Sequence, residues 1–92
     1  MKVYQSGIFR KTVKKLSSQE KLQLDDVIRE IINNPGIGEE KKGDFRYVFI
    51  YKFHLQKKHW LLAHRFSESQ LELIMLGPHE NYYRDLKKYL KK

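Results

Sequence analysis

The sequence contains no cysteine. Disulfide bonds and thiolate metal ligands are therefore excluded, which fits a reducing cytoplasm. No apolar run reaches the roughly 18 residues of a membrane-spanning helix, and residues 1–6 lack the apolar stretch of a signal peptide. Internal repeats and low-complexity linkers are absent as well. We therefore expect a single cytoplasmic domain over residues 1–92, with no membrane segment.

Acidic residues are scarce relative to basic ones: 11 Asp and Glu stand against 19 Lys and Arg, which gives a net charge of +8. A small domain with this imbalance is attracted to polyanions such as RNA, DNA or the ribosome, or to an acidic protein. The alternative is a charge that serves solubility alone. The composition favours a polyanionic or acidic partner without identifying it.

The first third of the chain shows helical periodicity after a short strand-like segment at 2–6. Apolar residues recur at helical spacing in two sets: Phe9, Val13 and Leu16, and then Leu24, Val27, Ile28 and Ile31. Between the sets, Ser17 and Glu20 form a capping-box pattern that starts a second helix. The segment NNPG at 33–36 ends that helix. The pattern predicts a helical hairpin with one apolar stripe.

Three strand-like runs follow a charged loop at 36–44. They cover 46–56, 59–67 and 70–76, and the two-residue linkers between them suit tight hairpins. A final helix is predicted over 80–91. The elements define an α+β fold: an N-terminal strand and a helical hairpin packed on an antiparallel sheet (β-α-α-β-β-β), followed by a short C-terminal helix.

The hairpin linkers also predict which residues share a face of the sheet, because side chains alternate with period two. Turns at 57–58 and 68–69 place Leu55 opposite Trp60 and Phe66 opposite Leu71. One face is then expected to pack on the helices: Phe49, Phe53, Leu55, Trp60, Leu62, Phe66, Leu71, Leu73 and Met75. The other mixes apolar and basic residues, as a half-open binding surface would: Ile50, Lys52, His54, Leu61, Ala63, Arg65, Glu72, Ile74 and Leu76.

This order of elements resembles that of the RelE/ParE toxins of type II toxin–antitoxin systems. Four segments carry the resemblance: FRKTVKKL at 9–16, VFIYKF at 48–53, WLLAHRF at 60–66 and LGPHENYYRDL at 76–86. The last is the most specific, because one branch of the family has a similar ending.

The resemblance implies a toxin that is held silent by a cognate acidic antitoxin. It also implies one of two activities, because RelE-like members cut mRNA in the ribosomal A site without a metal, whereas ParE-like members inhibit DNA gyrase and are not nucleases. Both share the fold, so the fold cannot decide between them. The partner is accordingly the ribosome with its mRNA or, as the alternative, DNA gyrase.

Metal-free RNA cleavage needs a base for the 2′-hydroxyl, cations around the phosphate and an acid for the 5′-oxygen. His79 is the first candidate, since it follows Gly77 and Pro78 at the rim of the sheet and histidine exchanges protons near neutral pH. In RelE-like ribonucleases with a comparable ending, the matching histidine belongs to the active site. The alternative is a turn histidine bonded to nearby backbone.

Four other residues complete the catalytic candidates. Lys52 matches a strand lysine that RelE-like enzymes use against the phosphate, and Arg65 on the same predicted face could act similarly. Arg65 could instead pair with Glu72, which lies directly opposite. Tyr82 and Tyr83 could stack on a base or position a phosphate, although packing of the last helix is the better explanation for at least one of them.

The predicted RNA-binding residues are Arg46, His54, Arg84, Lys87 and Lys88. A basic last helix can grip phosphates or receive an acidic antitoxin segment, and the alternative is a solvated helix with a favourably charged C-terminus. His64 falls on the core face and is expected to be structural, while His59 beside the turn is expected to be merely exposed. The histidines show no metal-ligand spacing, so neither a metal nor a cofactor is expected.

One departure from the family pattern bears on the activity. Many active RelE-like enzymes have an arginine near the start of the penultimate strand, where this chain has Trp60, Leu61 and Leu62. This departure implies a weaker grip on the phosphate, a substitute such as Arg65 or Arg46, or a different target. The sequence as a whole favours a ribosome-dependent mRNA endoribonuclease that inhibits translation, with a gyrase inhibitor as the alternative.

Overall fold

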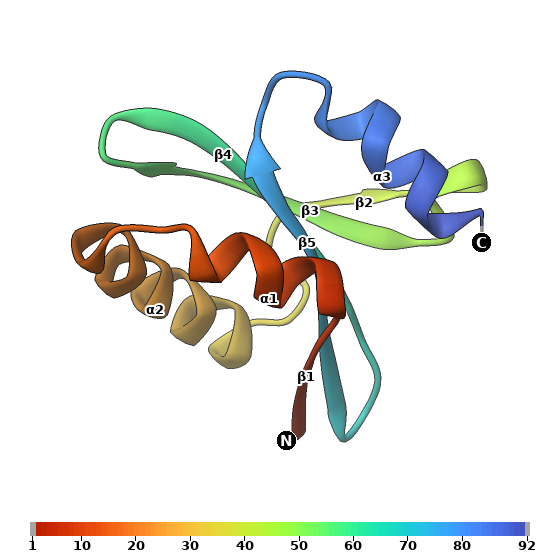
Figure 1. The fold of residues 1–92 in the computed structure, drawn as a ribbon. Helices are drawn as coiled ribbons and strands as arrows, with labels where there is room; N and C mark the ends of the chain where they lie inside the picture. Colours follow the sequence, from red (N-terminus) through yellow and green to blue (C-terminus); the bar gives the residue numbers. More distant parts are fainter. Residues whose placement is uncertain (1, 92) are drawn as a thin grey trace.

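The computed structural model describes residues 2–91, and its five-stranded sheet has the order β1-β5-β4-β3-β2 (Figure 1). The elements are β1 (Lys2–Gln5), α1 (Gly7–Lys14), α2 (Ser18–Asn33), β2 (Glu39–Lys41), the 3-10 turn η1 (Gly43–Phe45), β3 (Val48–Leu55), β4 (Lys58–Phe66), β5 (Gln70–Pro78) and α3 (Tyr82–Leu90). β1 runs parallel to β5, and the other strand pairs are antiparallel. The predicted α+β class is confirmed, with a mixed rather than a purely antiparallel sheet.

The helical hairpin starts both of its helices with a serine cap. The Ser6 hydroxyl accepts a hydrogen bond from the Phe9 N–H at 3.0 Å and donates one to the Ile74 carbonyl, which ties α1 to β5. Ser17 and Glu20 form the predicted capping box, with N···O distances of 2.8 and 3.2 Å. Within residues 2–91, no helix is both long and apolar enough to cross a membrane.

Helices α1 and α2 cover one face of the sheet (Figure 1). The core between them combines the predicted helix stripe with alternate strand residues: Phe9, Leu16, Leu24, Val27, Ile31, Phe53, Leu55, Leu62, Leu71, Leu73 and Leu76. Burying each large apolar side chain contributes about 1.5–3 kcal/mol, so this face supplies much of the driving force for folding.

Residues 39–41 form a strand where the sequence predicted a loop. β2 pairs with β3 and places Glu40 opposite Phe49. The close approach depends on Gly38, which has φ +99° and where a Cβ would lie 2.5 Å from the Ile50 carbonyl oxygen. Glu and Lys are depleted in strands, so the charged sequence of this edge strand gave no strand signal.

The β3–β4 hairpin turns one residue earlier than predicted. Gln56 and Lys57 form the turn, with φ values of 48° and 73°, as a type I′ turn requires. Leu55 consequently pairs with Lys58 rather than with Trp60. The pairing is displaced by an even number of residues, so the side chains of β3 and β4 keep their predicted faces.

A β-bulge in the β4–β5 hairpin exchanges the faces of two residues. Pairing starts in the predicted register at the turn but shifts between Ala63 and His64, which leaves Ile74 as the extra residue. Met75 therefore joins the core of the opposite face, and Leu76 joins the core beneath α1 and α2. The face prediction was wrong for both residues, because the sequence gives no sign of the bulge.

Helix α3 packs across the face that was predicted to be half-open. Its buried residues Tyr82, Leu86 and Leu90 form a second core with strand residues: Val48, Ile50, Leu61, Ala63, Ile74 and Met75. The prediction of an open surface is therefore wrong at the centre of this face. Polar residues remain accessible at its two ends, with Lys52 and His54 at one end and Arg65 at the other.

Candidate functional site

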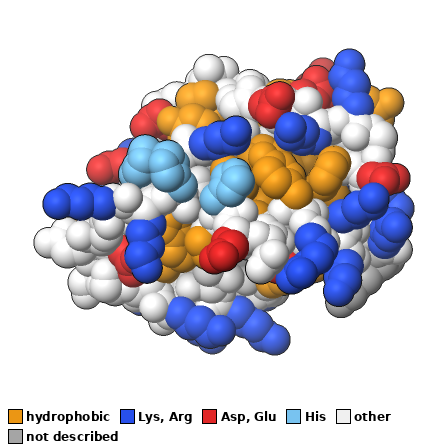
Figure 2. Space-filling view, turned by 90° about the horizontal axis from the view of Figure 1, so that it is seen from above, with side chains coloured by type: hydrophobic (Ala, Val, Ile, Leu, Met, Phe, Trp, Pro, Cys, Tyr) orange, Lys and Arg blue, Asp and Glu red, His pale blue; other side chains and the backbone are white. Residues whose placement is uncertain are grey.

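Histidines gather at the end of the sheet where β3 turns into β4. His54 and His59 are cross-strand partners, and their ring centroids lie 4.2 Å apart. His79 follows β5, and its backbone N–H donates to the His59 carbonyl oxygen with an N···O distance of 3.3 Å. Figure 2 shows histidine side chains side by side on this face, next to basic side chains and a hydrophobic patch.

An open pocket of about 420 Å³ lies among Lys52, His59 and His79, and we refer to it as the histidine pocket. It brings together two of the predicted catalytic residues, Lys52 and His79. His59 was expected to be merely exposed, so sequence reasoning missed it. In the observed register His59 pairs with His54 rather than with Gln56, which places it nearer to Lys52 than the predicted register did.

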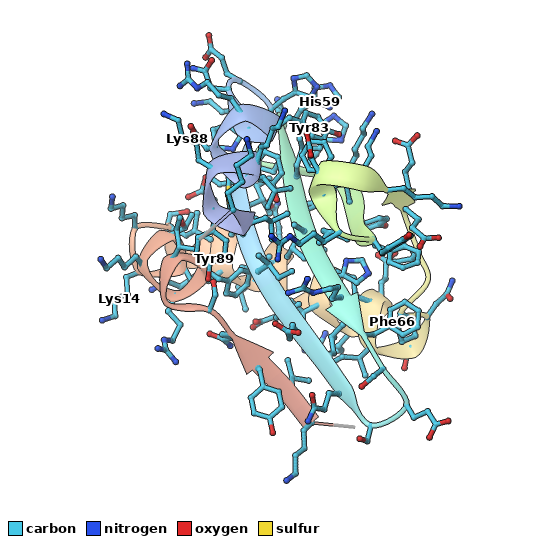
Figure 3. The ribbon with its side chains drawn as sticks, turned by 90° about the vertical axis from the view of Figure 1, so that its right-hand side faces the viewer. Lys14, His59, Phe66, Tyr83, Lys88 and Tyr89 are labelled. Carbon is cyan, nitrogen blue, oxygen red and sulfur yellow. The ribbon has the colours of Figure 1, made fainter. Side chains whose placement is uncertain are left out.

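Tyr83 forms an aromatic wall beside the histidine pocket. Its ring meets the His79 ring edge-on at a centroid distance of 6.3 Å and the Phe45 ring of η1 at 5.9 Å. The Lys41 ammonium lies 5.4 Å from the Tyr83 ring centroid, within the range of a cation–π contact. Figure 3 shows Tyr83 at the same end of the sheet as His59. Lys41 and Phe45 were missed because the sequence predicted a loop there.

Tyr82 is a core residue, which corrects the prediction that it is catalytic. It is 2% exposed, and its hydroxyl donates a hydrogen bond to the Met75 carbonyl oxygen at 2.6 Å. Burial raises the pKa of this phenol, so Tyr82 keeps its proton at neutral pH. Of the two tyrosines, Tyr82 anchors α3 to the sheet and Tyr83 lies beside the pocket.

Arg65 lies far from the histidine pocket. It is six residues beyond His59 on β4, which corresponds to roughly 20 Å at about 3.3 Å per residue. There it lines a second pocket of about 280 Å³ with Arg46, Tyr89 and Leu90, which we call the arginine pocket. The structure therefore does not bring Arg65 together with the other predicted catalytic residues, whereas it does bring it to Arg46.

The predicted RNA-binding residues of α3 differ in their contacts. Lys87 forms an ion pair with Asp44 of η1 at 2.9 Å, and its hydrogen bond lowers the pKa of the Asp44 carboxyl. Arg84 lies 3.5 Å from Asp85 in an exposed pair. Lys88 is exposed, and Figure 3 shows it on the outer side of the helix. Lys87 thus connects α3 to η1, while Lys88 is accessible to a partner.

The side chain of His64, a residue of β4, is buried and has a structural role. Its Nε2 lies 2.8 Å from the Pro35 carbonyl oxygen, which accepts a hydrogen bond from the neutral ring. Burial lowers the pKa of this imidazole. Among residues 2–91, no group of three His, Cys, Asp or Glu side chains is placed so that it could hold a metal ion.

Solved structures that are similar to this chain share its fold. A double arginine-to-alanine mutant of the E. coli toxin RelE in the free state has a TM-score of 0.72 and 18% identity, covering 96% of this chain and 95% of that chain. The E. coli RelBE toxin–antitoxin complex follows with a TM-score of 0.66 and 20% identity, covering 86% and 96%. The YoeB/ParE toxin from Agrobacterium tumefaciens has a TM-score of 0.61 and 18% identity, covering 86% and 99%. The fold is thus that of the RelE/ParE toxins.

The sequence places the chain within that class. The family model of the ParE-like toxin of type II bacterial toxin–antitoxin systems matches residues 3–87. The chain therefore belongs to the ParE-like toxins of type II toxin–antitoxin systems, and the resemblance that the sequence predicted is confirmed. No curated protein sequence is significantly similar to it.

Proposed function

We propose that this toxin inhibits translation by cleaving mRNA on the ribosome without a metal, and that the histidine pocket is its active site. The observation that supports the proposal is the convergence of His79 and Lys52 on one pocket, with Tyr83 beside it. An imidazole can transfer protons, an ammonium can stabilise the phosphate, and the half-buried ring of Tyr83 can stack on an RNA base.

Each group has a separate task. His79 exchanges a proton with one of the two reacting oxygens, because histidine changes its protonation near neutral pH. Lys52 stabilises the negative charge that grows on the phosphate in the transition state. Tyr83 stacks on a base next to the scissile phosphate, which positions the 2′-hydroxyl for attack. Arg65 lies too far away for this chemistry and binds RNA instead.

The proposal includes the partners that the composition favours. The chain acts as a single cytoplasmic domain, and a cognate acidic antitoxin neutralises it by covering its basic surface. Arg84, Lys88 and His54 contact RNA phosphates around the histidine pocket. Support comes from the net charge of +8 and from the similar RelE, which has been solved in a toxin–antitoxin complex.

The test is cleavage of mRNA on purified ribosomes, mapped by primer extension. His79→Gln should lower the cleavage rate by about 10²- to 10⁴-fold, as expected when a general acid or base is removed. Lys14→Gln is the matched control, because Lys14 is an exposed residue of α1, away from the pocket (Figure 3). An unchanged rate for the His79 variant at wild-type thermal stability would contradict the proposal.

Inhibition of DNA gyrase is the second candidate. The position of Arg46 and Arg65 favours it, because both arginines line the arginine pocket and not the histidine pocket. Among residues 2–91, Lys52 is then the only Lys or Arg that lines the histidine pocket, which leaves few cations there for a phosphate. Expression of the toxin distinguishes the two functions. Arrest of protein synthesis with continuing replication supports cleavage, whereas an SOS response with intact translation supports gyrase.

A further inference from the structure

We propose that His59 is a second catalytic residue and forms an acid–base pair with His79. The inference rests on the proposed function and completes it, because cleavage needs two proton transfers and His79 accounts for one. It also concerns a residue that the sequence led us to regard as merely exposed. Three observations carry it. The two residues share a pocket, a backbone hydrogen bond joins them, and neither imidazole ring makes a hydrogen bond within residues 2–91.

The backbone fixes His59 and His79 relative to each other. His79 N–H donates to the His59 carbonyl oxygen at 3.3 Å, just beyond the last residue pair of β4 and β5, Trp60 with Pro78. Both side chains line the histidine pocket together with Lys52. The two imidazoles therefore flank a volume of about 420 Å³ that is open at the protein surface.

Neither ring is committed to a structural bond. Within residues 2–91, the hydrogen-bonded histidine side chain is His64, whose Nε2 is held by Pro35. The rings of His59 and His79 touch aromatic neighbours instead, His54 at 4.2 Å and Tyr83 at 6.3 Å between centroids. These contacts restrict the rings but leave their nitrogens free to exchange protons with a substrate.

The two imidazoles account for both proton transfers of the cleavage reaction. One imidazole takes the proton of the 2′-hydroxyl, and the 2′-oxygen attacks the phosphorus to form a 2′,3′-cyclic phosphate. The bond from phosphorus to the 5′-oxygen breaks, and the other imidazolium donates its proton to that oxygen. Lys52 compensates the charge of the pentacoordinate phosphate between them. The net result is transesterification with one proton taken up and one released, so no metal or redox partner is required.

The decisive experiment compares His59→Gln and His79→Gln on ribosome-bound mRNA with a natural or a sulfur-substituted scissile bond. A sulfur in place of the bridging 5′-oxygen leaves as a thiolate and needs no acid. Each variant should cleave natural mRNA about 10²-fold or more slowly than the wild type. The sulfur substrate should restore the rate in the variant that lacks the acid and not in the variant that lacks the base.

The outcomes separate this inference from the proposed function. A His59→Gln rate within about twofold of wild type would overturn the role of His59 while leaving His79 in place. Rescue of both variants, or of neither, would also overturn the pairing, because the two residues would then not divide the proton transfers. A wild-type toxin that leaves ribosome-bound mRNA intact would overturn the proposed function itself. Thermal unfolding of both variants and cleavage by Lys14→Gln control for folding and for loss of charge.

Discussion

The two ends of the β3–β4 ribbon carry different chemistry on the same face of the sheet. The histidine pocket lies at the turn end, and the arginine pocket lies where β3 begins and β4 ends. Histidine exchanges protons near neutral pH, whereas arginine stays protonated throughout the accessible range. Only the histidine end can therefore supply acid–base catalysis, and the arginine end is suited to holding an anion.

Helix α3 connects the two ends. Its first residue, Tyr82, packs against Gly77 near the histidine pocket, and Tyr89 and Leu90 in its last turn line the arginine pocket. The helix covers the apolar floor between them with Leu86. Helix α3 thus separates two polar regions that the sequence analysis predicted as one half-open face. This separation predicts that catalysis and binding respond to different substitutions.

The largest expected effect is at the histidine end. Under the proposed function, Lys52→Ala should reduce the cleavage rate at saturating ribosome concentration by about 10²- to 10³-fold, since it removes the cation that we propose stabilises the transition-state phosphate. Single-turnover cleavage on purified ribosomes measures this rate.

The matched control for that prediction is Lys14→Ala, which removes the same charge from the exposed surface of α1. It should retain the wild-type rate. If both lysine variants lose activity equally, the effect comes from net charge, and the distinction between the two ends of the sheet fails.

The expected effect at the arginine end is smaller and of another kind. Arg65→Gln and Arg46→Gln should each weaken RNA binding and reduce the slope of log K against log salt by about 0.7, the value for one lost phosphate contact on a single strand. The saturated cleavage rate should stay unchanged. Binding titrations over a range of salt concentrations measure the slope.

Glu72 offers a check on this second prediction, because it pairs loosely with Arg65 at 3.7 Å. Glu72→Gln should slightly strengthen RNA binding, since it removes a carboxylate that competes with the phosphate. A drop in the cleavage rate at saturation in either arginine variant would instead place the arginine pocket in the chemistry.

The sequence predicted the helices and strands of the core better than the site, because the core elements follow local patterns and the site depends on contacts between distant segments. Helix periodicity, the Ser17–Glu20 capping box and strand alternation are local patterns, and the structure confirms them. The turn position, the β-bulge at Ile74 and the pairing of β2 depend on contacts between distant segments. Those contacts bring His59 into the histidine pocket and move Arg65 away from it.

The smallest expected effect concerns His64, the buried histidine of β4. Burial lowers its pKa in the folded state, while in the unfolded chain histidine titrates near about 6.5. As the pH falls below that value, the unfolded state takes up a proton that the folded state resists. Stability is therefore complete above about pH 6.5 and declines as the solution becomes more acidic.

His64→Gln should remove this contribution to the pH dependence, because the Gln amide can donate to the Pro35 carbonyl oxygen and carries no titrating group. Thermal unfolding at pH 7.5 and pH 5.5 should show a smaller loss of stability for the variant than for the wild type. His54→Gln is the control, since His54 is exposed and its removal should leave the difference in place. An equal loss in wild type and His64→Gln would show that the acid sensitivity arises elsewhere. If the loss shrinks only in His54→Gln, the exposed histidine end controls stability as well as chemistry.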